Sequence, residues 1–190
     1  MQDVRTRLIE ATFQEVFSKG YAGASLSNIL NRAEVKKGAM YHYFPSKKDM
    51  VLAMIEEKIE QRIEKKWKEL VDINENIIDA LIKILKDINS WDLTNGCPLG
   101  NLLQESLDYD EDFANTLTDI LNKWKKLFTN ILENAKQKDQ LNKDVDTEQC
   151  ATFLIASIEG ALLLTKKYED NNDFESCMNQ LTLYLNSLRK

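Results

Sequence analysis

The chain has 190 residues, which suits one large domain or two small ones. Hydrophobic residues make up 43% of it and charged residues 29%, as in soluble globular proteins, so the composition argues against a disordered chain. With only six Gly and two Pro, an all-β fold with its many turns is disfavoured, and the formal charge of −6 at first argues against a nucleic-acid partner.

The net charge hides an asymmetry along the chain. Residues 1–50 carry eight Lys or Arg and five Asp or Glu, a net charge of +3, whereas residues 51–190 have a net charge of −9. A basic segment on an otherwise acidic chain indicates that this segment binds an anion.

Targeting signals and metal motifs are not evident. Residues 1–7 contain no apolar segment, and no run of about 18 apolar residues predicts a membrane span. The three cysteines, Cys97, Cys150 and Cys177, form no CxxC pair, so neither a disulfide framework nor a zinc site is predicted. We therefore expect a cytoplasmic protein without a metal ion or cofactor, and no membrane partner.

The hydrophobic periodicity is helical over almost the whole chain and predicts an all-α fold of about nine helices. Lys19-Gly20 is typical of a helix end, Ser25 can cap the next helix, and the Ser46-x-x-Asp49 pattern begins a long one. Residues 90–98 have the composition of a loop. The expected helices are 4–18, 26–33, 37–43, 46–70, 77–88, 99–107, 113–132, 147–167 and 174–188.

Two short helices, 26–33 and 37–43, are joined by a tight turn and match a helix-turn-helix pattern. In the second helix, Met40 and Phe44 can face a core, while Lys37 and Tyr41 share another face. Hydrogen-bond donors on such a face suit a major groove and its flanking phosphates.

Lysines stand at two predicted helix starts, where the helix dipole disfavours cations. Lys36-Lys37 opens one helix and Lys47-Lys48 opens the next. Phosphates bound at both starts would offset the repulsion. The alternative is that these are ordinary solubilising surface lysines.

Segment 25–50, together with Phe17-x-x-x-Gly20-Tyr21, resembles the DNA-binding signature of the TetR family of bacterial repressors. The joint spacing of V-x-x-G-x-x-Y-x-Y-F-x-S-K carries the resemblance. It implies a three-helix DNA-binding head at residues 1–46 and a helical ligand-binding and dimerisation domain at residues 47–190. The DNA contacts that it implies are Ser25, Ser27, Lys36, Lys37, Gly38, Ala39, Tyr41, His42 and Lys47.

The resemblance also implies a small core in the head and shows one departure. The implied core residues are Phe17, Ile29, Val35, Tyr43 and Phe44. Glu34 stands where the family most often has Gly, so the residue either adopts a left-handed conformation or changes the turn.

The last two predicted helices favour a homodimer. Segment 150–164 is apolar on nearly all sides, so it must be buried on nearly all sides. Two helices from each subunit would form a four-helix bundle; the alternative is a core helix of a monomer. Glu159 interrupts the apolar run and either pairs across the interface or projects into a ligand cavity. The predicted interface residues are Ala156, Glu159, Gly160, Leu163, Phe174, Met178, Leu181 and Leu185.

Segment 96–105 contains a GC-P-x-G-N-x-x-x-E pattern that resembles the LmrA/YxaF-like branch of the TetR family, which responds to hydrophobic, often aromatic, compounds. The resemblance implies a small-molecule pocket in the middle helices. The aromatic residues could instead be ordinary core, and Cys97 is either a thiol sensor or an inert buried thiol. The predicted ligand-binding residues are Trp67, Trp91, Cys97, Asn101, Glu105, Trp124 and Phe128.

Taken together, the residues and the resemblance predict a transcriptional regulator rather than an enzyme. His42 is the only histidine and no nucleophile–base pair is evident. We expect a homodimeric repressor that binds a palindromic operator and is released by a small effector; activation instead of repression is the alternative within this class. The alternative is a helical ligand-binding or adaptor protein without specific DNA binding.

Overall fold

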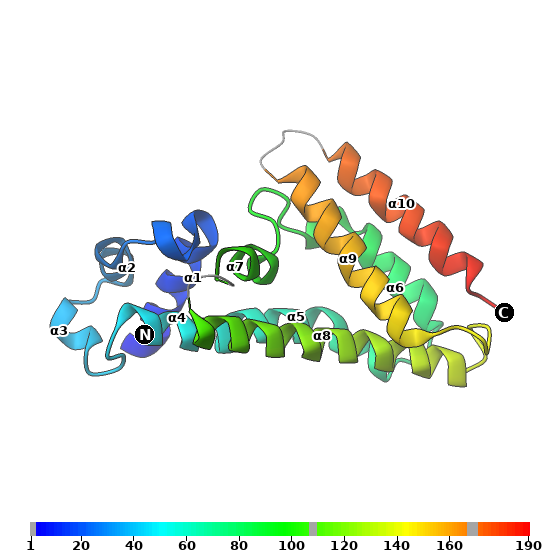
Figure 1. Ribbon diagram of the computed structural model, residues 1–190, viewed down its shortest axis with the longest axis horizontal. Coiled ribbons are helices and arrows are strands. Elements are labelled where there is room, and N and C mark those ends of the chain that lie inside the picture. Colours follow the sequence, from blue (N-terminus) through cyan, green and yellow to red (C-terminus); the bar gives the residue numbers. More distant parts are fainter. Residues whose placement is uncertain (1–2, 107–109, 167–170) are drawn as a thin grey trace. The chain divides into compact units, whose positions relative to one another are not determined.

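A computed structural model describes residues 3–106, 110–166 and 171–190 (Figure 1). Over these ranges the chain contains nine helices, when the continuous run α4–η1–α5 is taken as one, and no strand beyond an isolated bridge between Leu141 and Arg189. The predicted all-α fold is confirmed. The chain divides into two compact units, residues 1–62 with 98–120, and residues 63–97 with 121–190.

The first unit contains the basic N-terminal segment. Helix α1 packs against α2, α4 and α7, and its core is made of apolar side chains such as Leu8, Ile29 and Met40, all fully buried. Each such side chain contributes roughly 1.5–3 kcal/mol through its burial. The elements are α1 (Val4–Gly23), α2 (Leu26–Ala33), α3 (Lys37–Met40), α4 (Lys47–Met54), the π-helical η1 (Ile55–Glu60), α7 (Pro98–Ser106) and the start of α8 (Glu111–Gln137).

Of the three residues predicted to mark helix ends in the first unit, Gly20 and Ser46 behave as predicted and Ser25 does so only by position. Gly20 has φ +73° and interrupts α1, as predicted for the end of the first helix. The Ser46 hydroxyl accepts a hydrogen bond from the Asp49 backbone N–H at 3.2 Å, so the predicted cap is confirmed. Ser25 stands at the cap position of α2, but its hydroxyl pairs with that of Ser27 at 2.6 Å.

The turn between α2 and α3 contains the departure at Glu34. Glu34 has φ +54° and ψ +43°, so the left-handed alternative is the one observed. Its backbone N–H bonds back to Asn31 and Leu30, and Arg7 donates to the Ala33 carbonyl oxygen at 2.8 Å. These bonds hold the C-terminus of α2 in place without a glycine.

The second unit is a helical bundle in which α10 packs against α9 and α6 (Figure 1). The predicted helix 46–70 is α-helical only to Trp67, after which the chain tightens into a 3₁₀ turn, and the predicted helix 77–88 stops at Lys86. The predicted ends at Leu107 and Lys167 lie outside the described residues. The elements are α5 (Gln61–Trp67), η2 (Lys68–Val71), α6 (Ile77–Lys86), η3 (Ile88–Ser90), the rest of α8, α9 (Thr147–Thr165) and α10 (Asn172–Ser187).

Helix α9 is the one described helix that is long and apolar enough to cross a membrane by length and composition. Side chains along it, among them Leu154, Ile158 and Leu162, are buried against the rest of the second unit. Burial of this kind is what a core helix of a helical bundle shows.

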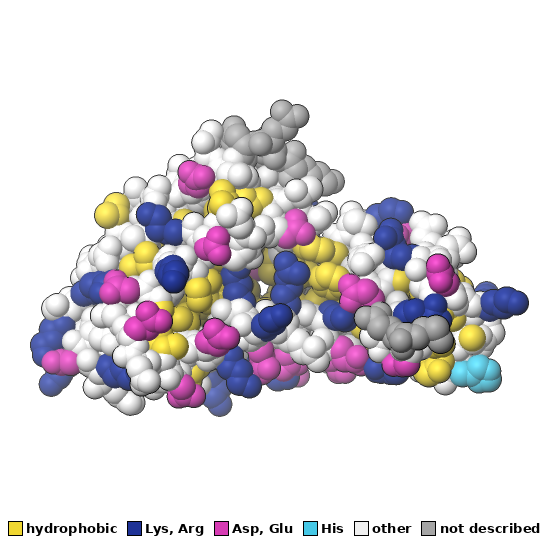
Figure 2. Space-filling model, turned by 180° about the vertical axis from the view of Figure 1, so that it is seen from behind, with side chains coloured by type: hydrophobic (Ala, Val, Ile, Leu, Met, Phe, Trp, Pro, Cys, Tyr) yellow, Lys and Arg dark blue, Asp and Glu magenta, His cyan; other side chains and the backbone are white. Residues whose placement is uncertain are grey.

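Basic and acidic side chains are interspersed over the face shown in Figure 2. Several acidic and basic residues of the protein form partly exposed ion pairs, such as Lys58 with Glu10 at 2.7 Å. Pairs of this kind contribute little to stability, so the helices are held together mainly by apolar burial.

Candidate functional site

Short helix α3 presents a polar face to solvent. Lys36, Lys37, Gly38, Tyr41 and His42 are exposed, while Met40 on the opposite face is fully buried. The Lys37 ammonium lies 6.0 Å from the centre of the Tyr41 ring. The structure therefore brings these five predicted DNA contacts together on one accessible surface.

Glycine at position 38 is not required by the packing of the protein itself. A Cβ atom built there would meet nothing within 4 Å. The remaining predicted contacts lie nearby in the chain: Ser27 is exposed, and Ser25 and Ala39 are half-buried. The space outside Gly38 is thus open to a partner that approaches the backbone closely.

The predicted anion site at the start of α4 is already occupied by groups of the protein. The Lys47 ammonium donates to the Tyr21 carbonyl oxygen at 2.6 Å and lies 4.4 Å from the Tyr21 ring centre. Lys48 pairs with Asp110 at 2.8 Å and Asp112 at 2.6 Å. Burial lowers the pKa of Lys47, against the pull of nearby carboxylates, so its role is at least partly internal.

The implied core of the head needs one correction. Ile29 and Phe44 are buried and Phe17 and Val35 are half-buried, but Tyr43 is 44% exposed. Helix α3 ends at Met40, so Tyr43 falls in the following turn rather than on the inward face of a longer helix.

A buried carboxylate in α1, Glu15, was missed by the sequence reasoning. Its side chain is only 2% exposed, and its Oε1 accepts from the Asn28 amide at 2.9 Å and from the Lys19 ammonium at 3.0 Å. These bonds lower the pKa of Glu15 despite its burial. Glu15 thereby ties α1 to α2. The available signal was its spacing, because it falls on the same helical face as Leu8, Ala11 and Thr12.

The second unit gathers the predicted aromatic residues into one cluster. Trp67 lies 5.9 Å from Trp91 and 4.8 Å from Phe128, which in turn lies 5.9 Å from Trp124, measured between ring centres. Phe174 extends the cluster, 5.4 Å from Trp91. The four aromatic residues predicted to bind a ligand are thus connected through a continuous series of ring contacts.

Three polar atoms in this unit are buried without a hydrogen-bond partner in the part of the chain that the structure describes. They are the indole Nε1 atoms of Trp91 and Trp124 and the Oε1 atom of Glu159. Burial raises the pKa of the Glu159 carboxyl, and a hydrogen bond from Cys97 opposes this shift. Buried polar groups nearly always have a hydrogen-bond partner, so we expect these atoms to bind a ligand or a water molecule.

Two predicted ligand contacts, Asn101 and Glu105, lie on α7, which belongs to the first unit, whereas the aromatic cluster belongs to the second. The Glu105 carboxylate accepts hydrogen bonds from the backbone N–H groups of Tyr21 and Ala22, at 2.8 and 2.6 Å. Both of its oxygens thus accept hydrogen bonds from the end of α1, and the predicted ligand contact at Glu105 stays a prediction.

The predicted interface residues separate into exposed and buried groups. On α9, Ala156 is exposed, Leu163 is 57% exposed, and Glu159 and Gly160 are half-buried. The four predicted on α10 are instead core residues of the unit, because their stripe packs inward on α9 and α6; they are Phe174, Met178, Leu181 and Leu185.

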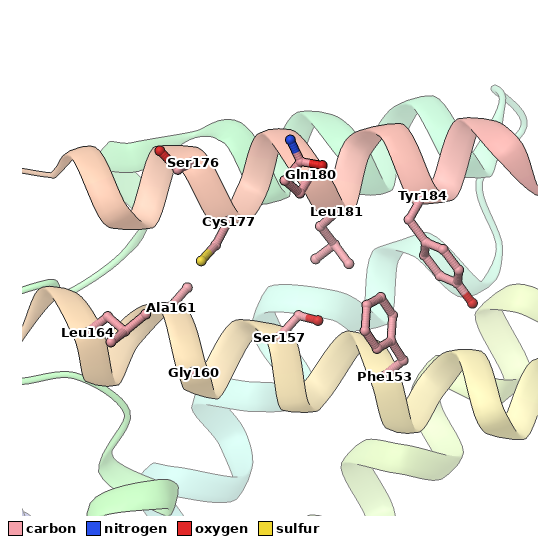
Figure 3. A pocket seen from close by; sticks show the side chains of 10 residues that line it. All are labelled: Phe153, Ser157, Gly160, Ala161, Leu164, Ser176, Cys177, Gln180, Leu181 and Tyr184. Atoms are coloured by element: carbon pink, nitrogen blue, oxygen red, sulfur yellow. The ribbon is translucent and has the colours of Figure 1, made fainter.

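A groove of about 570 Å³ runs between α9 and α10 (Figure 3). The rings of Phe153 and Tyr184 meet edge to face at one part of it, and Cys177 points toward Ala161 at another. Tyr184 also pairs with the Cys150 thiol at 3.0 Å, and burial together with this bond raises the pKa of Tyr184 to about 12.

Metal-ligating side chains do not gather within the described residues, where no group of three or more His, Cys, Asp or Glu could hold an ion. The candidate binding features are a polar exposed surface at α3 in one unit, and an aromatic cluster and an apolar groove in the other.

Comparison with known protein families agrees with both units. Residues 8–54 match the family described as bacterial regulatory proteins, tetR family, and residues 75–181 match the tetracyclin repressor-like C-terminal domain. The chain belongs to the TetR family of bacterial helix-turn-helix transcriptional regulators.

Individual relatives extend over most of the chain. An HTH-type transcriptional regulator in the lacX 3′ region of Lactococcus lactis is 31% identical, covering 93% of this chain and 90% of its own. The HTH-type transcriptional repressor NemR of Escherichia coli is 29% identical, covering 86% and 84%. The regulators YxaF and LmrA of Bacillus subtilis are 22% and 23% identical. These matches cover 88% and 86% of this chain and 87% and 86% of the relatives, and they support the family assignment.

Solved structures share the fold. A TetR transcriptional regulator from Chloroflexus aurantiacus superposes with a TM-score of 0.86 at 21% identity, covering 98% of this chain and 96% of its own. This similarity confirms a TetR fold with an N-terminal helix-turn-helix and a C-terminal helical domain.

Proposed function

We propose that the protein is a homodimeric repressor that binds a palindromic operator in the cytoplasm through α3 and is released by a small apolar or aromatic effector. The observation that carries the proposal is the exposed face of Lys36, Lys37, Tyr41 and His42, supported from behind by the buried Met40. Two such faces related by a twofold axis would read two half-sites one helical turn apart.

Dimerisation is supported by the exposed apolar surface of α9 and α10. Phe153 is 48% exposed, Leu164 53% and Leu183 62%, and the groove between the helices continues this surface. A Cβ atom at Gly160 would meet nothing within 4 Å, so this face of α9 is open. Contiguous apolar patches of this kind typically mark an interface.

Effector binding is supported by the aromatic cluster and its unpartnered atoms. Trp91 and Trp124 each have a buried indole N–H that needs an acceptor, and both lie among aromatic rings. A ligand with an aromatic body and a hydrogen-bond acceptor meets both requirements. Release from DNA follows if the ligand binds the DNA-free conformation more tightly.

The DNA-binding experiment begins with selection of genomic fragments bound by the purified protein. A mobility-shift titration then compares the wild type with the Lys37→Ala/Tyr41→Ala double variant, with the exposed Lys126→Ala as the control for a lost surface charge. We expect the double variant to lose at least tenfold in operator affinity and the control to bind normally. Equal affinity of the wild type for operator and unrelated DNA would instead support an adaptor protein without specific DNA binding.

The effector experiment is a thermal-shift screen of aromatic and cationic compounds on the wild type and on Trp124→Phe, which removes the indole N–H and keeps an aromatic ring. Hits should raise the Tm of the wild type more than that of the variant and should weaken operator binding. Compounds that stabilise both proteins equally would argue against a ligand site at Trp124.

A further inference from the structure

The carboxylate of Glu105, near the end of α7, reaches the backbone of the last residues of α1, which follow the interruption at Gly20. Its Oε2 atom accepts from the Tyr21 N–H at 2.8 Å and its Oε1 atom from the Ala22 N–H at 2.6 Å. Each oxygen takes one backbone donor, and hydrogen bonds to an ionised acceptor are the strong ones.

Gly20 makes room for this contact. With φ at +73°, the residue turns the chain so that two successive N–H groups point at α7. A Cβ atom there would lie 2.5 Å from Glu105 Oε2, closer than atoms can approach. The glycine of the Phe17-x-x-x-Gly20-Tyr21 pattern therefore has two roles: it adopts the positive φ of the turn, and it leaves space for the Glu105 carboxylate.

Two further side chains, Lys47 and Phe113, contact Tyr21. Lys47 of α4 donates to its carbonyl oxygen at 2.6 Å and lies over its ring, and Phe113 of α8 packs edge to face on the ring with centres 4.7 Å apart. The last residues of α1, which lead into α2, are thus held against α4, α7 and α8 within one compact unit. Since α2 leads directly into α3, the same contacts determine where the exposed face of α3 points relative to α7 and α8.

We propose that Glu105 is a positioning residue for DNA recognition: by clamping the backbone of Tyr21 and Ala22, it fixes the orientation of α2 and α3 on the rest of the first unit. The proposal rests on the DNA-binding function proposed above. Glu105 does not touch DNA in this account. Loss of the two hydrogen bonds to Glu105 allows α2 and α3 to change orientation. Binding to two half-sites at a fixed distance then becomes less favourable.

The test compares Glu105→Ala and Glu105→Gln with the wild type and with Gln104→Ala, an exposed neighbour on the same helix that serves as the control. Mobility-shift titrations use the selected operator and a series in which the half-site spacing is changed by one and two base pairs. Circular dichroism and the active fraction, determined by stoichiometric titration, confirm that each variant is folded.

We expect Glu105→Ala to lose about tenfold in affinity for the natural operator and to discriminate less between spacings, because the loss of two charge-assisted hydrogen bonds frees the head. Glu105→Gln, which keeps one acceptor oxygen, should lie between it and the wild type. The slope of log affinity against log salt should not change, since no phosphate contact is removed.

Three outcomes would overturn the proposal. Glu105→Ala could bind like the wild type, it could lose the same factor at every spacing, or both Glu105 variants could gain affinity with a changed salt slope, as expected if the carboxylate merely repels DNA. Failure of the wild type to select any operator would contradict the proposed function instead, so the two failures are distinguishable.

Discussion

At the scale of single residues, the head depends on polar groups whose conformation or burial is unusual. Glu34 occupies a left-handed conformation that favours glycine, and Glu15 keeps a carboxylate charged inside the unit. Glu34 lies at the C-terminal end of α2, directly before α3, and Glu15 is hydrogen-bonded to Asn28 of α2. Their energetic contributions can be measured without knowing the operator.

Replacing Glu34 by Gly should raise the free energy of unfolding by about 1 kcal/mol, because a non-glycine residue in the left-handed region is strained by that order. The exposed contact with Arg7, at 4.0 Å, contributes little and its loss should not reverse the effect. Chemical denaturation measures the change. Glu34→Val, whose branched side chain fits this conformation poorly, should be less stable than the wild type; a destabilised glycine variant would show that the turn is not strained.

Glu15→Ala should lower the free energy of unfolding by about 1–3 kcal/mol at pH 7, because the charge-assisted hydrogen bonds that the buried carboxylate accepts from Asn28 and Lys19 are lost. The effect should depend on pH. Since hydrogen bonds from Asn28 and Lys19 lower the pKa of Glu15 in the folded state below its ordinary value of 4.5, the carboxylate stabilises the fold above that value.

As the pH falls from 4.5 through the lowered pKa, the carboxylate takes up a proton and this stabilisation is lost. Denaturation at pH 7 and at acid pH should therefore show the difference between wild type and Glu15→Ala shrinking on acidification. The exposed Glu64→Ala serves as the control, with little change at either pH. A difference that grows toward acid pH would contradict the assignment.

At the scale of elements, helices separated in sequence form the site-bearing units. Helix α7 follows the loop of the second unit but packs on α1 in the first, and α8 contributes to both units. The first unit therefore combines the N-terminal helices with a helix from the middle of the chain. The prediction that a boundary at residue 46 separates the two functional domains remains to be tested by limited proteolysis.

Gly20→Ala tests the packing of α7 on α1. The added methyl group would collide with the Glu105 carboxylate and would hold an L-residue at φ +73°, so we expect the free energy of unfolding to fall by about 1–2 kcal/mol. Gly38→Ala is the matched control, because a Cβ atom there meets nothing within 4 Å. Equal melting temperatures for the two variants would argue against a tight α1–α7 contact.

At the scale of the whole molecule, the charge of −6 is the sum of a basic head segment and an acidic remainder. An acidic body is repelled by DNA, which directs the duplex to the heads. Apolar surface is likewise localised, with Phe153, Leu164 and Leu183 exposed on α9 and α10. The proposed dimer would bury this surface.

Leu183→Glu should convert the proposed dimer into a monomer of 22.0 kDa, because a charge in an apolar interface is not compensated. Light scattering coupled to size-exclusion chromatography measures the mass, and operator affinity should fall with loss of the second half-site. Asn130→Glu, on the exposed side of α8, introduces the same charge as a control. A Leu183→Glu protein that stays dimeric would place the interface elsewhere.

The sequence by itself determined the helical fold and the family, because hydrophobic periodicity and the spacing of Val35, Gly38, Tyr41 and Ser46 are local properties of the chain. It also indicated the aromatic residues of the second unit, which do cluster. Only the tertiary structure decided which face of an apolar helix is buried, since hydrophobic periodicity does not show which other element packs against that helix. Phe174 and Leu185 accordingly proved to be core residues. The partner of Glu105, 84 residues away at Tyr21, was likewise beyond any local pattern.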